Sequence, residues 1–177
     1  MRLLSFCFLI ILYEKRFKTG LVIGRFQPFH KGHHYLIKKA LLSVNNLIVG
    51  IGSSNVRNKE NPLGYQKRRK MVEMYLEEEK LKGRVIKVVP LPDYPSDCLW
   101  FSETLKRVGG GIDVVIGNND WVNGIFEKAG YLIMRVPYYK KHILEGEKIR
   151  KLIQKGERWK DRVPEYLVPE IILSLSR

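Results

Sequence analysis

The sequence predicts an α/β fold in which helices cover both faces of a parallel β-sheet. Five short apolar runs recur along the 177 residues, each with the length and β-branched content of a buried strand. Stretches with apolar residues at three- and four-residue spacing, typical of amphipathic helices, lie between these runs. Strands that alternate with helices indicate a parallel sheet, because each parallel connection must cross a face of the sheet. Ligands of such sheets bind at the carboxyl ends of the strands.

The first predicted strand, residues 21–23, leads directly into the first predicted helix. Gly24 ends the strand, and Pro28 fixes a turn before the helical pattern begins. His30 and His33 therefore lie at the N-terminus of a helix. A helix N-terminus carries unpaired N–H groups and a partial positive charge, and both attract phosphate. This stretch is the strongest candidate for an anion-binding site.

The next segments continue the alternation. Residues 46–51 are the second predicted strand, and the polar, turn-rich residues 57–62 predict a mobile loop beside the site. Residues 65–82 predict a helix with no internal Gly or Pro. Arg68 lies in a basic run of this helix, where it is read either as solvated surface or as a functional arginine. Residues 85–91 are the third predicted strand.

The second half of the chain predicts two more strands, residues 112–116 and 131–136. Ser96 or Asp97 is predicted to cap the helix before the fourth strand. Residues 117–122 follow the fourth strand and open a short helix.

Charge and cysteine content narrow the class of protein. The chain has 32 Lys and Arg against 18 Asp and Glu, a formal net charge of +14. This balance favours anionic partners, although a solvated basic surface explains many of the lysines equally well. Cys7 and Cys98 have neither metal-ligand nor disulfide spacing, which predicts a reducing, cytoplasmic location. Residues 1–18 are predicted to be an extension before a single domain of residues 19–177, and the apolar run 3–13 within it is shorter than the roughly 20 residues that span a bilayer.

Residues 24–33, Gly-Arg-Phe-Gln-Pro-Phe-His-Lys-Gly-His, resemble the GRFQPFHxGH signature of archaeal-type nicotinamide mononucleotide (NMN) adenylyltransferases of the nucleotidylyltransferase superfamily. The resemblance covers residues 19–177 and implies a Rossmann-like nucleotidylyltransferase fold. It implies an enzyme that transfers AMP from ATP to NMN, giving NAD and pyrophosphate, with Mg²⁺ accompanying ATP. The implied catalytic residues are His30, His33 and Arg150. The implied ATP-binding residues are Gly24, Arg25, Phe26, Gln27, Phe29, Gly32, Asn119, Gly146 and Ile149.

The same resemblance implies a separate site for the acceptor. Ser53, Asp93 and Trp100 match the positions beside NMN, with the Trp100 ring stacked on the nicotinamide. Each has a structural alternative, since Ser53 and Asp93 can be ordinary turn residues and Trp100 a core aromatic. The family is commonly oligomeric, so the implied partners are ATP, NMN and further copies of the chain, with no nucleic acid and no membrane.

The last motif departs from the family pattern. Residues 145–150 read Glu-Gly-Glu-Lys-Ile-Arg, where the family has Ser-Gly-Thr-x-Ile/Val-Arg. Glu145 and Glu147 replace hydroxyls that donate to phosphate, and a carboxylate only accepts. We expect both to point to solvent rather than to pair with a nearby lysine or to bind Mg²⁺. Two other interpretations stay open: an adenylyltransferase for another acceptor, such as nicotinate mononucleotide or phosphopantetheine, and a basic nucleotide- or RNA-binding module.

Overall fold

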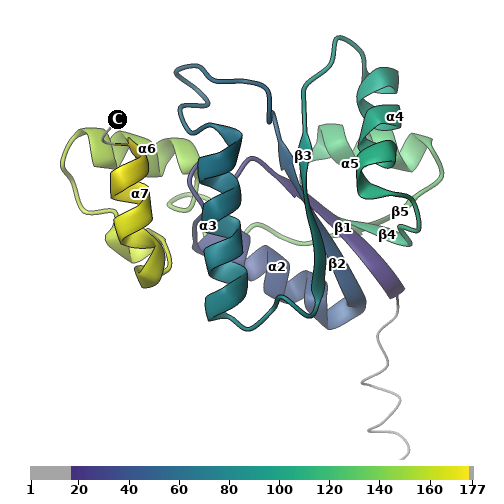
Figure 1. Cartoon of the computed structure of the whole chain (residues 1–177), viewed down its shortest axis with the longest axis horizontal. Helices are drawn as coiled ribbons and strands as arrows, with labels where there is room; N and C mark the ends of the chain where they lie inside the picture. Colours follow the sequence, from purple (N-terminus) through teal and green to yellow (C-terminus); the bar gives the residue numbers. More distant parts are fainter. Residues whose placement is uncertain (1–16, 176–177) are drawn as a thin grey trace, which may run out of the picture.

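The computed structural model describes residues 17–175, and within them lies a five-stranded sheet (Figure 1). All the strands are parallel, in the order β3-β2-β1-β4-β5. Their bounds are β1 Phe17–Gly24, β2 Val44–Gly52, β3 Val85–Leu91, β4 Val114–Gly117 and β5 Leu132–Arg135. The predicted fold class and the five predicted strands are confirmed.

β1 is the central strand, and it is longer than the apolar run that predicted it. Its ladder with β2 begins at Phe17. Leu21 and Val22 have no exposed surface, because β2 and β4 flank the strand and helices cover its two faces. Residues 17–18 thus belong to the sheet rather than to a preceding extension. The remainder of the predicted extension, residues 1–16, lies outside the described residues.

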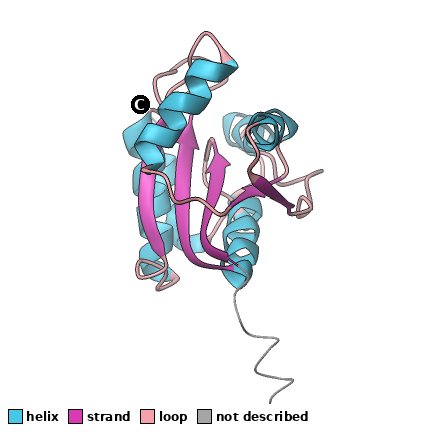
Figure 2. Cartoon of the chain, turned by 90° about the vertical axis from the view of Figure 1, so that its right-hand side faces the viewer, coloured by secondary structure: helices cyan, strands magenta, loops and turns pink. Residues whose placement is uncertain are grey.

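Figure 2 shows helices on either side of the strands. Their bounds are α2 Lys31–Ser43, α3 Tyr65–Glu78, α4 Asp97–Val108, α5 Asp120–Lys128, α6 Gly146–Gln154 and α7 Val168–Leu175, with 3₁₀ turns at Lys160–Arg162 and Glu165–Leu167. α3 ends at Glu78 rather than at the predicted residue 82, because Lys80 takes a left-handed conformation, with φ of 54°, that a helix cannot continue. Ser96, one of the two residues predicted for the role, caps α4.

The two faces of the sheet carry separate hydrophobic cores. The larger core includes Val22 and Val49 and packs against residues of α2, α3 and α7. The smaller core includes Leu21 and Ile48 and packs against residues of α4 and α5. Neighbouring residues of a strand point to opposite faces, so a strand that is covered on both sides must be apolar throughout. This requirement explains the continuous apolar runs in the sequence.

The carboxyl ends of the strands meet at one edge, where the chain reverses its direction across the sheet. From β1 the chain proceeds outward through β2 to β3, and it then returns to β4 on the other side of β1. A switch of this kind opens a crevice between the loops that leave the two strands. The loops after β1 and β4 therefore flank the expected ligand site.

None of the helices among residues 17–175 is long and apolar enough to cross a membrane.

Candidate active site

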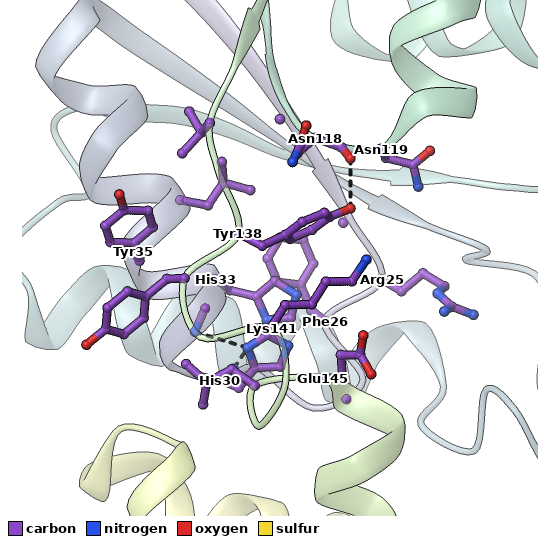
Figure 3. A pocket seen from close by; sticks show the side chains of 18 of the residues that line it. Arg25, Phe26, His30, His33, Tyr35, Asn118, Asn119, Tyr138, Lys141 and Glu145 are labelled. Carbon is purple, nitrogen blue, oxygen red and sulfur yellow. Dashed lines mark hydrogen bonds between the residues drawn. The ribbon is translucent and has the colours of Figure 1, made fainter.

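A cavity of about 400 Å³ lies at this switch point (Figure 3). Its walls are the loop after β1, the start of α2, the end of β4, the start of α5, the segment after β5 and the start of α6. The volume is that of an ordinary small-molecule site. The N-termini of α2, α5 and α6 at its wall favour an anionic ligand, because each presents N–H groups and a partial positive charge.

His30 and His33 form a stacked pair at the start of α2. The Gly32 N–H donates to His30 Nδ1 (3.1 Å), and the His30 N–H donates to His33 Nδ1 (3.2 Å). The ring centroids are 3.7 Å apart. A ring nitrogen that accepts carries no proton, so each neutral imidazole has its hydrogen on Nε2. Gly32 permits this packing, because a Cβ there would lie 2.9 Å from the His30 ring.

The surroundings keep both histidines neutral. Burial lowers the pKa of His30 to about 4. Burial also lowers the pKa of His33 well below its ordinary value, and the neighbouring His30 lowers it further. At pH 7 both rings are therefore neutral donors through Nε2. Such donors, fixed in advance by their Nδ1 hydrogen bonds, suit the stabilisation of charge that develops during a reaction.

The low pKa of His30 predicts a loss of stability in acid that one substitution removes. The unfolded chain binds a proton at this residue near pH 6.5, whereas the folded chain binds it only near pH 4. Above pH 6.5 the titration of His30 therefore does not change the free energy of unfolding. As the pH falls from 6.5 to 4, this free energy decreases by about 3 kcal/mol. His30→Asn retains an acceptor at the helix cap but cannot titrate, so urea unfolding should show a smaller acid loss in the variant. Equal losses in the two proteins would contradict the assigned pKa.

Arg150 and Gly146 place α6 against the loop that follows β1. Arg150 donates through Nη1 to the Gln27 carbonyl (2.6 Å) and through Nη2 to the Glu60 carbonyl (2.8 Å). A Cβ on Gly146 would lie 2.5 Å from the Gln27 carbonyl oxygen, so only glycine lets α6 begin this close. Burial, and then the charge of Arg25, lower the pKa of Arg150, although a guanidinium stays charged at neutral pH. Arg25 and Arg150 both line the cavity.

Most of the residues predicted for catalysis and ATP binding lie around this cavity. Those that line it are Gly24, Arg25, Phe26, Gln27, His30, Gly32, His33, Asn119, Gly146 and Arg150. Phe29 and Ile149 do not contact the cavity, because both side chains are fully buried in the larger core, where they support the loop and α6. The Gln27 side chain is also engaged, since it exchanges two hydrogen bonds with the backbone of Leu63 (3.2 and 3.0 Å). Asn119 also caps α5.

The residues predicted to bind NMN lie outside this cavity. Asn55 joins the ends of β2 and β3, because its side chain donates to the Asp93 carbonyl (3.1 Å) and accepts from the Asp93 N–H (2.8 Å). Ser53, next to the end of β2, has a left-handed conformation with φ of 49°. Trp100 is 2% exposed and packs on Trp121, with ring centroids 4.7 Å apart. Trp100 therefore occupies the core position that the sequence left as its alternative, while Ser53 and Asp93 remain predicted acceptor residues.

Asn118, Tyr138 and Lys141 also line the cavity. The sequence places Asn118 beside Asn119 in the turn after the fourth strand, but it does not single out Tyr138 or Lys141 for this site. The Tyr138 hydroxyl donates to the Asn118 carbonyl (2.7 Å), and Lys141 Nζ lies 4.3 Å from the centre of the Tyr138 ring (Figure 3). The signal in the sequence is the Tyr-Tyr-Lys-Lys run of residues 138–141 after the last strand. Trp121, which is 49% exposed at the start of α5, also lies outside the predicted set.

The two glutamates that depart from the family pattern are paired with lysines of their own helix. Glu145 lies 3.1 Å from Lys148, and Glu147 lies 2.7 Å from Lys151. The hydrogen bond from Lys151 lowers the pKa of Glu147. The expectation that both carboxylates simply point to solvent is therefore corrected. The pairing arises because residues three or four apart meet on one face of a helix.

The fold and the site define the class of protein. Residues 21–152 match the model of the cytidylyltransferase-like family. The chain is 36% identical over 158 residues to the nicotinamide-nucleotide adenylyltransferase of Archaeoglobus fulgidus, covering 87% of this chain and 90% of the relative. It is 35% identical over 155 residues to the enzyme of the same name from Methanolobus tindarius, covering 87% of each. The chain belongs to the family of nicotinamide-nucleotide adenylyltransferases.

Solved structures agree with this assignment. A bifunctional NMN adenylyltransferase/ADP ribose pyrophosphatase from Francisella tularensis matches with a TM-score of 0.73 and 27% identity over 82% of this chain. The same enzyme complexed with AMP and a Mn ion matches with a TM-score of 0.68 and 26% identity. This chain spans 44% of the length of each of those two chains, so the likeness concerns one part of a larger protein.

Proposed function

We propose that this protein transfers AMP from ATP to NMN, forming NAD and pyrophosphate. The observation that carries the proposal is the convergence of two neutral histidines, two arginines and the N-termini of α2, α5 and α6 on one cavity. All of these groups are donors or cations, which suits a polyphosphate ligand. The names of the relatives support NMN as the acceptor.

The transfer needs no catalytic base. The phosphate of NMN has a second pKa of about 6, so at pH 7 it is mostly dianionic and can attack directly. One of its oxygens bonds to the α-phosphorus of ATP, the bond from that phosphorus to the β-bridging oxygen breaks, and pyrophosphate leaves. The protein aligns the two anions and offsets their charge. The donors for this task are the Nε2–H groups of His30 and His33 and the guanidinium groups of Arg25 and Arg150.

We propose that Mg²⁺ enters the site with ATP as part of the substrate. Among residues 17–175 no group of three or more His, Cys, Asp or Glu residues could hold a metal ion. Mg²⁺ in nucleotide enzymes is commonly bound by substrate phosphates with few protein ligands. The Mn ion in the AMP complex of the Francisella enzyme supports the use of a divalent metal.

One assay tests the proposal and its alternatives. Purified protein is given ATP and Mg²⁺ with NMN, nicotinate mononucleotide or phosphopantetheine in parallel, and pyrophosphate is followed. We expect release with NMN. Release with phosphopantetheine alone would move the protein to another acceptor class, and no release with either mononucleotide would refute the proposal. Nucleic-acid affinity that falls steeply with salt would instead favour the binding-module interpretation.

Trp121 presents an exposed aromatic surface next to Trp100, one of the predicted acceptor residues. Its Nε1 donates to Asp97 (3.1 Å), at the start of the helix that carries Trp100. We expect Trp121→Ala to raise the KM for NMN about tenfold and to leave the KM for ATP nearly unchanged, because stacking is worth roughly 1–3 kcal/mol per ring. Trp100→Ala should instead destabilise the fold by about 3–5 kcal/mol. A Trp100→Ala variant of normal stability with a raised KM for NMN would instead support the prediction that the Trp100 ring stacks on the nicotinamide.

The family hydroxyls can be restored to test Glu145 and Glu147. Because each carboxylate is paired with a lysine, we expect the Glu145→Ser, Glu147→Thr double variant to stay active. It should bind ATP more tightly by about 1 kcal/mol, the scale of one net hydrogen bond. Its Mg²⁺ requirement should be unchanged. A loss of activity that high Mg²⁺ restores would identify one glutamate as a metal ligand.

A further inference from the structure

The side chain of Arg68 is fully buried, although it sits in the basic run Lys-Arg-Arg-Lys of α3. Its guanidinium donates through Nη1 to the carbonyls of Arg25 (2.8 Å) and Gly52 (2.7 Å) and through Nη2 to the carbonyl of Ser53 (3.0 Å). A buried charge is costly unless hydrogen bonds compensate it. All three bonds go to main-chain carbonyls. The guanidinium therefore holds main-chain segments together instead of forming an ion pair through these bonds.

These carbonyls lie where β1 and β2 separate. The paired residues of the two strands end at Gly24 and Ile51, so the carbonyls beyond them need other donors. The guanidinium supplies those donors and joins the two strand ends after their ladder has stopped. Arg68 thus extends the connection between β1 and β2 into the loops of the site.

Two residues beside these contacts have left-handed backbone conformations that side chains disfavour. Phe26, which directly follows Arg25, has φ of 52°, and Ser53 has φ of 49°. Non-glycine residues keep such conformations only where surrounding contacts hold them. The hydrogen bonds from Arg68 to Arg25 and to Ser53 are contacts of this kind, and they fix both turns at once.

The two turns belong to different parts of the site. Arg25 and Phe26 line the cavity that is proposed to bind ATP. Ser53 lies outside this cavity and is one of the residues predicted to bind the acceptor. We propose that Arg68 is a positioning residue that fixes the ATP side and the acceptor side of the site relative to one another. This inference rests on the proposed adenylyl transfer, in which two anions must meet in line at one phosphorus atom.

The geometry requires an arginine. A guanidinium has donors spread over a planar fork, so one side chain can reach the ends of two strands. An ammonium is a single point and cannot span the same three carbonyls. Burial, and then the charge of Arg25, lower the pKa of Arg68 to about 10, while Asp93 opposes the shift. The group therefore remains a cation near the two anionic substrates.

Arg68→Lys and Arg68→Ala test the role, with Arg69→Ala as the matched control. Arg69 is the next residue of the same helix, but it is exposed and paired with Glu73 (2.7 Å). We expect Arg68→Lys to lower kcat by about 100-fold, because a displacement near 1 Å between reacting groups has that effect. Arg69→Ala should keep the wild-type rate. In Arg68→Ala, low and non-denaturing guanidinium should restore part of kcat, whereas ammonium should not.

Amide hydrogen exchange supplies a readout that does not depend on turnover. Residues 24–27 and 52–55 should exchange faster together in Arg68→Lys, while α7 should be unchanged. A wild-type kcat in Arg68→Lys, an effect on only one substrate KM, or unchanged exchange in both segments would overturn the proposal. If Arg68→Ala does not fold, Arg68→Lys decides alone. If wild-type protein releases no pyrophosphate, the proposed function fails, and the exchange result still decides whether Arg68 joins the two loops.

Discussion

Replacing His33 with alanine should lower kcat by about 10²–10³-fold while changing the KM for ATP little, as expected for the loss of one donor that acts on developing charge. In the structure the His30 N–H donates to His33 Nδ1, which leaves Nε2–H as the donor available to a ligand. Negative charge grows on the bridging oxygen as pyrophosphate leaves. A fixed neutral donor therefore contributes more to the transition state than to the ground state.

His33→Asn separates this catalytic role from the structural one. The Asn Oδ1 can replace Nδ1 as the acceptor of the His30 N–H, but the side chain has no group at the position of Nε2. We expect the same loss of kcat as in the alanine variant, with the stability of the helix start retained. His34→Ala is the matched control, because His34 is the next residue and lies near Glu79 (3.9 Å). Unchanged kcat with a raised ATP KM would show that His33 only binds the nucleotide.

The parts of the molecule that the sequence predicts are those set by local pattern. Buried parallel strands must be apolar on both faces, so the five runs appear in the sequence as continuous apolar segments. The loop after β1 is also predictable, because its glycines, histidines and arginine are concentrated in ten consecutive residues. The predicted start of β1 is too late, because the polar residues Lys18 and Thr19 separate Phe17 from the apolar run that begins at Leu21.

The parts that the sequence does not predict depend on contacts between distant segments. Arg68 lies in a run of four basic residues, and the sequence leaves open whether it is solvated surface or a functional arginine. Its burial follows from the approach of two strand ends. Trp100 is covered by Trp121, which lies 21 positions further along the chain. Lys141 reaches the cavity because the segment after β5 passes the end of β4, where the Tyr138 hydroxyl donates to the Asn118 carbonyl. No periodicity encodes these three arrangements.

Replacing Gly146 with alanine should lower kcat/KM for ATP by about 10²-fold or more, because the added methyl group misplaces the start of α6. The new Cβ would lie 2.5 Å from the Gln27 carbonyl oxygen, so the helix must move by about 1 Å to reach ordinary contact. That movement breaks the hydrogen bond from Arg150 to the same carbonyl (2.6 Å) and shifts its guanidinium away from the phosphates. Gly124→Ala is the control, because a Cβ on Gly124 of α5 meets no atom within 4 Å.

The double variant Gly146→Ala, Arg150→Ala shows whether the effect passes through Arg150. If the shift of α6 acts mainly by displacing the guanidinium, adding Gly146→Ala to Arg150→Ala should cost little more activity, since residues that share one interaction are not additive. If the helix N-terminus binds the phosphates independently, the two losses should multiply. Steady-state kcat and KM for ATP in the four proteins separate these cases. A Gly146→Ala variant with wild-type kcat/KM would mean that the Gln27 loop yields to the methyl group and that the close approach of α6 is not needed for catalysis.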